Sequence, residues 1–98
     1  MTGKRIPAAE ALAQGIVNAV TPAGDLMPAA LDYAGLVAAK PPLAVQWAKR
    51  LVNQGPEAAL GTALTLEQVA LAGLFVTEDG REGIRAFVEK RPPSFQGH

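Results

Sequence analysis

Residues 58–77 read AALGTALTLEQVALAGLFVT, and this stretch sets the architecture expected of the whole chain. Its only charged residue is Glu67, and its leucine, valine and phenylalanine side chains fall on most sides of a helix. A helix that is apolar all round is stable only where it is covered all round. Three short alanine-rich helices elsewhere in the 98 residues offer little surface to cover it. We therefore expect the chain to oligomerise or to be part of something larger.

Proline and glycine residues divide the rest of the sequence into further helices. Pro7 suits the first turn of a helix, and Gly15 is expected to adopt the left-handed conformation that ends it. The β-branched run at 16–20 favours a short strand or an extended link. Asp25 is expected to cap the second helix and Glu57 to open the fourth. The predicted fold class is mainly α, with at most one short strand and about five helices: 8–14, 25–39, 43–54, 58–77 and a last one that follows 78–83 and ends near 91.

The charge balance and the residue types exclude several classes of function. Nine Lys and Arg residues face nine Asp and Glu residues, so the net charge is zero, whereas a nucleic-acid partner requires a basic face. The chain has no cysteine and one histidine, His98, which is expected to lie in a disordered end. Thiolate catalysis, cysteine zinc sites and a triad with an internal histidine are therefore excluded. We expect no metal site.

The apolar stretch also raises the question of a membrane. Residues 58–76 are long enough to cross a bilayer, but Glu67 near their middle would cost about 2.5–3.5 kcal/mol there. No apolar leader follows the basic pair near the start of the sequence. The sequence thus predicts a cytoplasmic protein with no membrane partner, and a small membrane-associated protein is a third interpretation.

Four segments resemble one protein family, in that family's order. Residues 2–18, TGKRIPAAEALAQGIVN, resemble the TG-(K/R)-x-I-x-A-x-E-A-x-x-x-G-L-V-N run of the enoyl-CoA hydratase/isomerase, or crotonase, superfamily. The segments 20–22 (VTP) and 40–45 (KPPLAV), the latter with Lys49 behind it, follow in order. Residues 77–95, TEDGREGIRAFVEKRPPSF, closely match the family ending TED-x-x-EG-x-x-AF-x-EKR-x-P-x-F. Together the segments extend across essentially all 98 residues.

The resemblance implies a particular part of the family fold. Family members are roughly two and a half times this length, and their N-terminal spiral of ββα units forms the acyl-CoA pocket. That part supplies the oxyanion hole and, in hydratases, two catalytic glutamates, and the resemblance begins after them. Residues 1–98 are therefore expected to be a single helical region like the C-terminal trimerisation part, without the spiral domain. The implied partners are further copies, as a trimer or hexamer, or the missing N-terminal half.

The resemblance also implies two substrate-binding residues. In related hydratases the Phe and Lys of the AFVEKR helix approach the adenine and phosphate end of CoA, and the matching residues are Phe87 and Lys90. An aromatic face suits a purine and a cation suits phosphate. The alternative is that Phe87 is a core residue and Lys90 a solvated cation near a helix end. A CoA thioester would be the substrate, and no cofactor is expected.

No residue of the chain is expected to be catalytic. Hydration of an enoyl thioester requires a base, an acid and donors to the enolate oxygen. Only Glu67 lies in an apolar setting, where a subunit contact is the more common role. We expect the chain alone to be inactive and the intact enzyme to hydrate or isomerise trans-2-enoyl-CoA in fatty acid metabolism. The alternative is a stand-alone, non-catalytic helical oligomerisation module.

Overall fold

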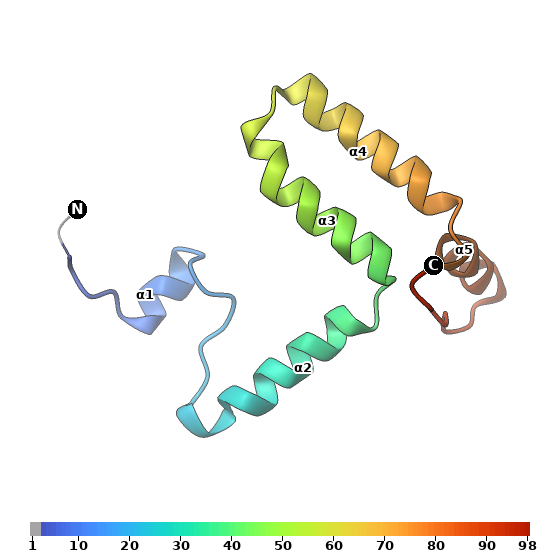
Figure 1. Cartoon of the computed structure of the whole chain (residues 1–98). Helices are drawn as coiled ribbons and strands as arrows, with labels where there is room; N and C mark the ends of the chain where they lie inside the picture. The colour runs from blue at the N-terminus through green and yellow to red at the C-terminus, as the bar shows by residue number, and fades with distance from the viewer. Residues whose placement is uncertain (1–2) are drawn as a thin grey trace. The chain divides into compact units, whose positions relative to one another are not determined.

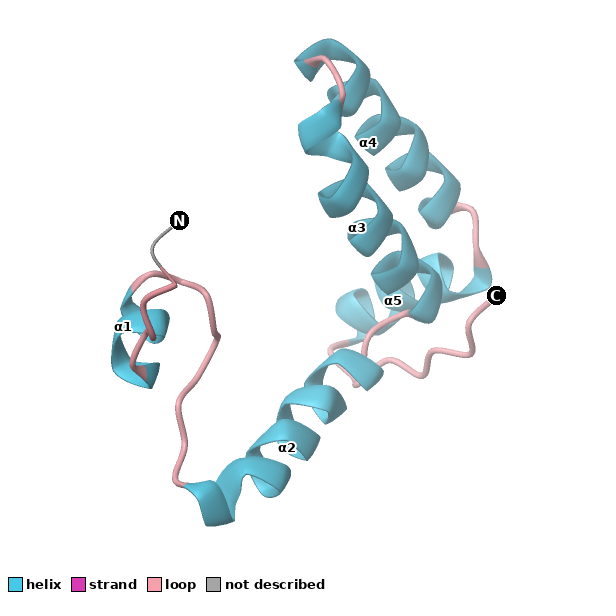
Figure 2. Cartoon of the chain, turned by 60° about the vertical axis from the view of Figure 1, so that its left-hand side comes forward, coloured by secondary structure: helices cyan, strands magenta, loops and turns pink. Residues whose placement is uncertain are grey.

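The computed structural model describes residues 3–98, and this part of the chain is helical without strands (Figures 1 and 2). The mainly α fold class and the expected number of helices are confirmed. The run at 16–20 forms a link and no strand, because a strand requires a hydrogen-bonding partner that the described residues do not provide. The helices are α1 (Ala8–Ala13), α2 (Leu26–Ala38), α3 (Pro42–Gln54), α4 (Leu60–Phe75) and α5 (Glu78–Glu89).

The chain divides into two compact units, one up to Tyr33 and one from Ala34 onward. In the first unit, Gly15 has φ +71° and its N–H donates to the Leu12 carbonyl, while the Ile16 N–H donates to Ala11. This arrangement is a Schellman motif, so the prediction for Gly15 is confirmed. Asp25 is not a helix cap. It closes a short 3₁₀ turn, because its N–H donates to the carbonyl of Pro22 before α2 begins.

In the second unit α3 and α4 lie side by side and run in opposite directions (Figures 1 and 2). The 3₁₀ turn Gly55–Glu57 joins them. The expectation that Glu57 opens the fourth helix is therefore wrong: Ala58 is extended, and α4 begins at Leu60. Helix α5 packs against α4 after a bend of 75°.

Thr77 forms the junction between α4 and α5. Its hydroxyl accepts a hydrogen bond from the Gly80 N–H (3.0 Å) and donates one to the Leu74 carbonyl (2.7 Å). The expected helix 58–77 includes Thr77, and this bound is wrong, because Thr77 is the N-cap of α5. Gly80 allows the close approach of the two helices, because a Cβ added there would clash with the backbone carbonyl oxygen of Leu74.

The side chains buried within the described residues are few and small. Only Ala70, Ala86 and Asp79 are buried. Helix α3 turns an apolar face, including Trp47 and Leu51, toward α4. Other sides of α4 stay uncovered by the described residues, as its composition predicts: Val69 and Phe75 are each more than half exposed, and so is Val76 at its C-cap.

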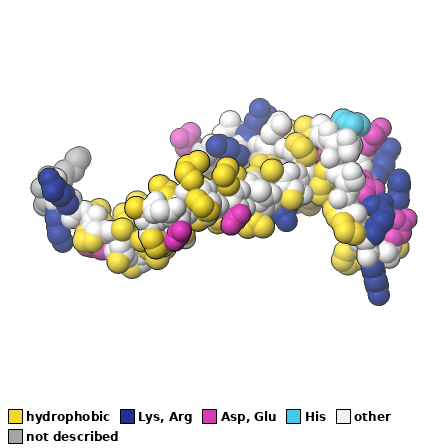
Figure 3. All heavy atoms as spheres, turned by 90° about the horizontal axis from the view of Figure 1, so that it is seen from below, with side chains coloured by type: hydrophobic (Ala, Val, Ile, Leu, Met, Phe, Trp, Pro, Cys, Tyr) yellow, Lys and Arg dark blue, Asp and Glu magenta, His cyan; other side chains and the backbone are white. Residues whose placement is uncertain are grey.

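Figure 3 shows hydrophobic side chains over much of one face, with charged side chains gathered where α5 lies. Among the described residues, no single helix is both long enough and apolar enough to cross a membrane. Helices α4 and α5 reach that length together only across their 75° bend.

We expect Gly80→Ala to lower the free energy of unfolding by about 1–3 kcal/mol, because the added methyl group forces α4 and α5 apart. Gly73→Ala is the matched control, since Gly73 lies within α4 and nothing surrounds its Cβ position. The control should be neutral or stabilise the helix by up to about 1 kcal/mol. Urea unfolding followed by circular dichroism measures both. Equal effects of the two substitutions would contradict the role of Gly80.

Candidate functional site at the end of helix α5

Helix α5 ends in a second Schellman motif, and the residue in its left-handed position is Lys90. The Arg91 N–H donates to the Ala86 carbonyl (3.0 Å), and the Lys90 N–H donates to Phe87 (3.3 Å). Lys90 has φ +55° and is the only non-glycine residue with positive φ in the described part of the chain. Glycine normally occupies this position, since a side chain there costs about 1–2 kcal/mol. Residues in unfavourable backbone conformations cluster at functional sites, so the charged side chain of Lys90 is a candidate for binding a ligand.

Phe87 lies three residues before Lys90 and is exposed to solvent. Its exposed fraction is 85%, and Val88 and Ile84 beside it on α5 are also exposed. Within the described residues Phe87 is therefore not a core residue, which was the alternative interpretation of the sequence. An exposed aromatic ring and a cation three residues apart at a helix end suit a planar, negatively charged ligand.

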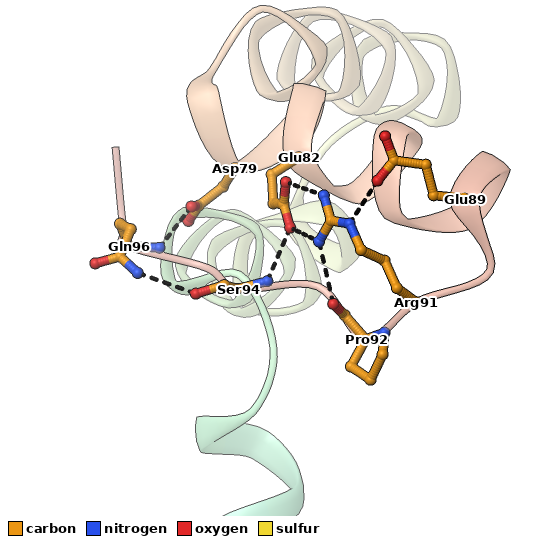
Figure 4. A network of polar contacts seen from close by, with 7 residues as sticks. All are labelled: Asp79, Glu82, Glu89, Arg91, Pro92, Ser94 and Gln96. Carbon is orange, nitrogen blue, oxygen red and sulfur yellow. Dashed lines mark hydrogen bonds and ion pairs between the residues drawn. The ribbon is translucent and has the colours of Figure 1, made fainter.

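Arg91 follows Lys90, and its guanidinium group is paired with two carboxylates (Figure 4). Its Nη1 and Nη2 donate to the two oxygens of Glu82 at 2.6 and 2.8 Å, and its Nε donates to Glu89 at 2.6 Å. Such two-point pairs are among the stronger polar interactions in proteins. The sequence pattern does not predict the pairing of Arg91 with Glu82. Arg91 is held in this way, whereas Lys90 has no carboxylate partner among residues 3–98.

The pair also changes the acidity of both partners. The hydrogen bonds from Arg91, followed by the bond from the Ser94 N–H, lower the pKa of Glu82 from 4.5 to about 2. The bonds to Glu82 and Glu89 raise the pKa of the Arg91 guanidinium. Both groups are therefore charged throughout the physiological range of pH, and the end of α5 keeps one geometry across it.

The C-terminal segment, residues 92–98, returns along α5 and is held there. Both carboxylate oxygens of Asp79 accept backbone hydrogen bonds, from Gln96 (2.6 Å) and Gly97 (2.8 Å). His98 was expected in a disordered end, and this expectation is wrong. Its carbonyl accepts from the Asp79 N–H (3.0 Å), and its Nε2 lies 3.1 Å from Glu78.

A separate apolar groove lies between α3 and α4. It has a volume of about 560 Å³ and includes Leu51, Leu60, Leu64 and Glu67 in its lining. Glu67 is exposed at the edge of this groove and has no hydrogen-bond partner among the described residues that would orient it as a base. The groove has the composition of a surface that packs against another apolar surface.

Comparison with known proteins agrees with these features. The sequence profile of the enoyl-CoA hydratase/isomerase family matches residues 1–98. The chain belongs to this family. It is 44% identical over 96 residues to YngF of Bacillus subtilis, a protein assigned to the enoyl-CoA hydratases/isomerases, and the match covers 98% of the chain and 37% of YngF. It is 39% identical over 97 residues to the 2,3-dehydroadipyl-CoA hydratase of Escherichia coli, covering 99% of the chain and 38% of that enzyme.

Solved structures of this family show the same arrangement of helices. The crystal structure of enoyl-CoA hydratase from Bacillus anthracis superposes with a TM-score of 0.92 at 39% identity. The match covers 99% of the chain and 38% of that structure. The resemblance inferred from the sequence motifs and the expected helical region of the crotonase fold are thus confirmed. The chain spans somewhat more than a third of the length of these relatives.

The carboxylates that organise this enoyl-CoA hydratase/isomerase segment are the residues that sequence reasoning missed. Asp79 and Glu82 stand in the segment 78–83, which was expected to precede the last helix, whereas α5 begins at Glu78 and contains both residues. The available signal was Pro92-Pro93, which ends the helix and allows the following backbone to turn back. Periodicity along α5 does not show that this backbone meets Asp79.

We expect acid to destabilise the chain through Glu82. A carboxyl group whose pKa is lowered by folding stabilises the folded state above its unfolded pKa, and this contribution is lost as pH falls from about 4.5 toward 2. Glu82→Gln should therefore lower the melting temperature at pH 6 and change it much less near pH 2. Circular dichroism melts across this range measure the difference.

The matched control is Glu57→Gln, a carboxylate for which the structure gives no hydrogen bond. It should keep the wild-type dependence of the melting temperature on pH. A Glu82→Gln chain with the same acid dependence as the wild type would contradict the assignment.

Proposed function

We propose that these 98 residues work as the C-terminal helical part of an enoyl-CoA hydratase/isomerase of acyl-CoA metabolism. The intact enzyme would hydrate or isomerise a trans-2-enoyl-CoA. The observation that supports this most directly is the family match over the whole chain. The name of the Escherichia coli relative, a 2,3-dehydroadipyl-CoA hydratase, supports a CoA thioester as the substrate class.

In this proposal the segment assists catalysis but does not perform it. Hydration requires a base that activates water, an acid that protonates the α-carbon, and donors to the enolate oxygen. Among the described residues the buried carboxylate, Asp79, is already occupied by two backbone N–H groups. Glu67 lines the α3–α4 groove, and no hydrogen-bond partner among the described residues orients it as a base. The chain by itself is therefore inactive, and the reacting groups come from the part of the fold that its relatives have in addition.

The apolar surface of α4 is the part that assembles. Burial of apolar surface contributes roughly 25 cal/mol per Å², and α4 exposes several large side chains on the sides that α3 and α5 leave open. We assign these sides and the α3–α4 groove to contacts with neighbouring copies, in a trimer or hexamer, and to closure of the acyl-CoA pocket. The cytoplasmic location of the protein stays a prediction from the sequence.

Phe87 and Lys90 are the proposed contacts to CoA. The exposed ring of Phe87 would stack on the adenine, and Lys90 would meet a phosphate. Arg91 cannot serve in place of Lys90, because Glu82 and Glu89 hold its guanidinium. The left-handed conformation of Lys90 supports this role, since glycine would fit the backbone better.

The uncovered apolar surface by itself favours a second function, a stand-alone helical oligomerisation module. The two functions differ in one property. A module without a ligand site would assemble but would not bind CoA, whereas the enzyme segment would both assemble and bind CoA.

Substitutions at Lys90 separate backbone fit from charge. Lys90→Gly should raise the free energy of unfolding by up to about 1–2 kcal/mol, because glycine adopts φ +55° without strain. The same substitution should weaken CoA binding several-fold, and more at low salt than at high salt. Calorimetric titration with CoA measures binding, and urea unfolding measures stability.

Phe87→Ala should weaken CoA binding about tenfold or more, the loss expected for one aromatic ring stacked on a base. Val88→Ala is the control, since Val88 is a neighbouring exposed residue outside the proposed contact. Oligomers that bind no CoA would support the oligomerisation module. Equal effects of the two substitutions would remove Phe87 from the site.

A further inference from the structure

The backbone of the C-terminal segment is bound by carboxylates in the way that a protein binds an extended peptide. Asp79 is 3% exposed, and both of its oxygens accept backbone N–H groups, from Gln96 and Gly97. Glu82 accepts a third, from Ser94 at 3.0 Å. A buried carboxylate is costly unless it is fully hydrogen-bonded, and here its partners all come from this one segment. The C-terminal segment therefore satisfies the buried charge of α5.

The same segment reaches a second helix. Gly97 has φ +87°, and a Cβ added there would lie 3.5 Å from Cγ of Pro42, at the first residue of α3. The Phe95 ring lies over Gly83 of α5, 3.7 Å from its Cβ position. Helix α5 otherwise packs against α4. The C-terminal segment thus connects α5 with the beginning of α3.

We propose that the C-terminal segment is a strap, fastened by Asp79 and Glu82, that fixes the direction of α5 relative to α3. Thr77 and the 75° bend after α4 form the hinge on one side. The strap closes the other side, so that α5 cannot rotate about this hinge. The strap requires no CoA site and stands independently of the proposed function.

Hydrogen exchange of single backbone amides tests how the strap is fastened. In the 98-residue chain, Asp79→Asn replaces one acceptor oxygen with an amide group that itself donates, so that two N–H groups compete for one acceptor. Exchange at Gln96 and Gly97 should accelerate about tenfold or more, as expected for a lost hydrogen bond to a charged group. Glu78→Gln is the matched control, because the Glu78 side chain pairs with the His98 ring and accepts no backbone N–H of the segment among the described residues. Similar exchange in the two variants would overturn the proposal.

A second variant loosens the strap without changing α5. Gly97→Ala places a side chain at φ +87°, a conformation that only glycine adopts readily. Exchange at Gln96 should accelerate as in Asp79→Asn, while the Ala86 amide within α5 keeps its protection. Unchanged exchange at Gln96 in this variant overturns the proposal even if Asp79→Asn fails to fold.

The distance between the two helices tests what the strap does. Because the chain has no cysteine, Lys49→Cys and Arg85→Cys would place one spin label on α3 and one on α5. The distance distribution should be narrow in this background and clearly broader when Asp79→Asn or Gly97→Ala is added. A distribution that stays narrow while the strap amides exchange faster would show that α5 is fixed by other contacts, and would overturn the proposal.

Discussion

Helix α4 is apolar on most of its sides, and the described residues cover it only where α3 and α5 pack. This constraint governs the rest of the molecule. Burial of its leucine, valine and phenylalanine side chains is the main stabilisation available to so alanine-rich a chain, and most of that burial has to come from outside these residues. The family comparison agrees, since relatives carry the same helices within chains more than twice as long.

Polar interactions provide the order that apolar packing does not supply around α5. Thr77 caps the helix, Gly80 lets it approach α4, and Glu82 holds Arg91 beyond its end. Asp79 draws the C-terminal segment back along the helix. The outcome is a rigid helix end from which Phe87 and Lys90 project into solvent. This arrangement suits a segment that presents a few side chains to a ligand and a large apolar surface to its neighbours.

The sequence predicted those features that depend on local chemistry. Gly15 ends α1 as expected, because a left-handed residue after a helix is a local requirement. The motifs identified the family, and the composition of α4 predicted that its own chain leaves it uncovered. Other features depend on partners distant in the sequence. The run at 16–20 forms no strand without a neighbour, and nothing in the pattern pairs Asp79 with Gln96, 17 residues later. The spacing of Ile84, Phe87 and Val88 in the sequence places them on one face of a helix, but it does not show whether that face is covered.

The mass of the purified chain in solution, measured by light scattering together with its helical content, tests the central claim that α4 is a contact surface. The account predicts helical assemblies of the 10.2 kDa chain in threes, as a trimer or a hexamer, and no folded monomer. A stable 10.2 kDa species with full helical content would contradict it, because such a chain would keep α4 folded with its apolar sides in water.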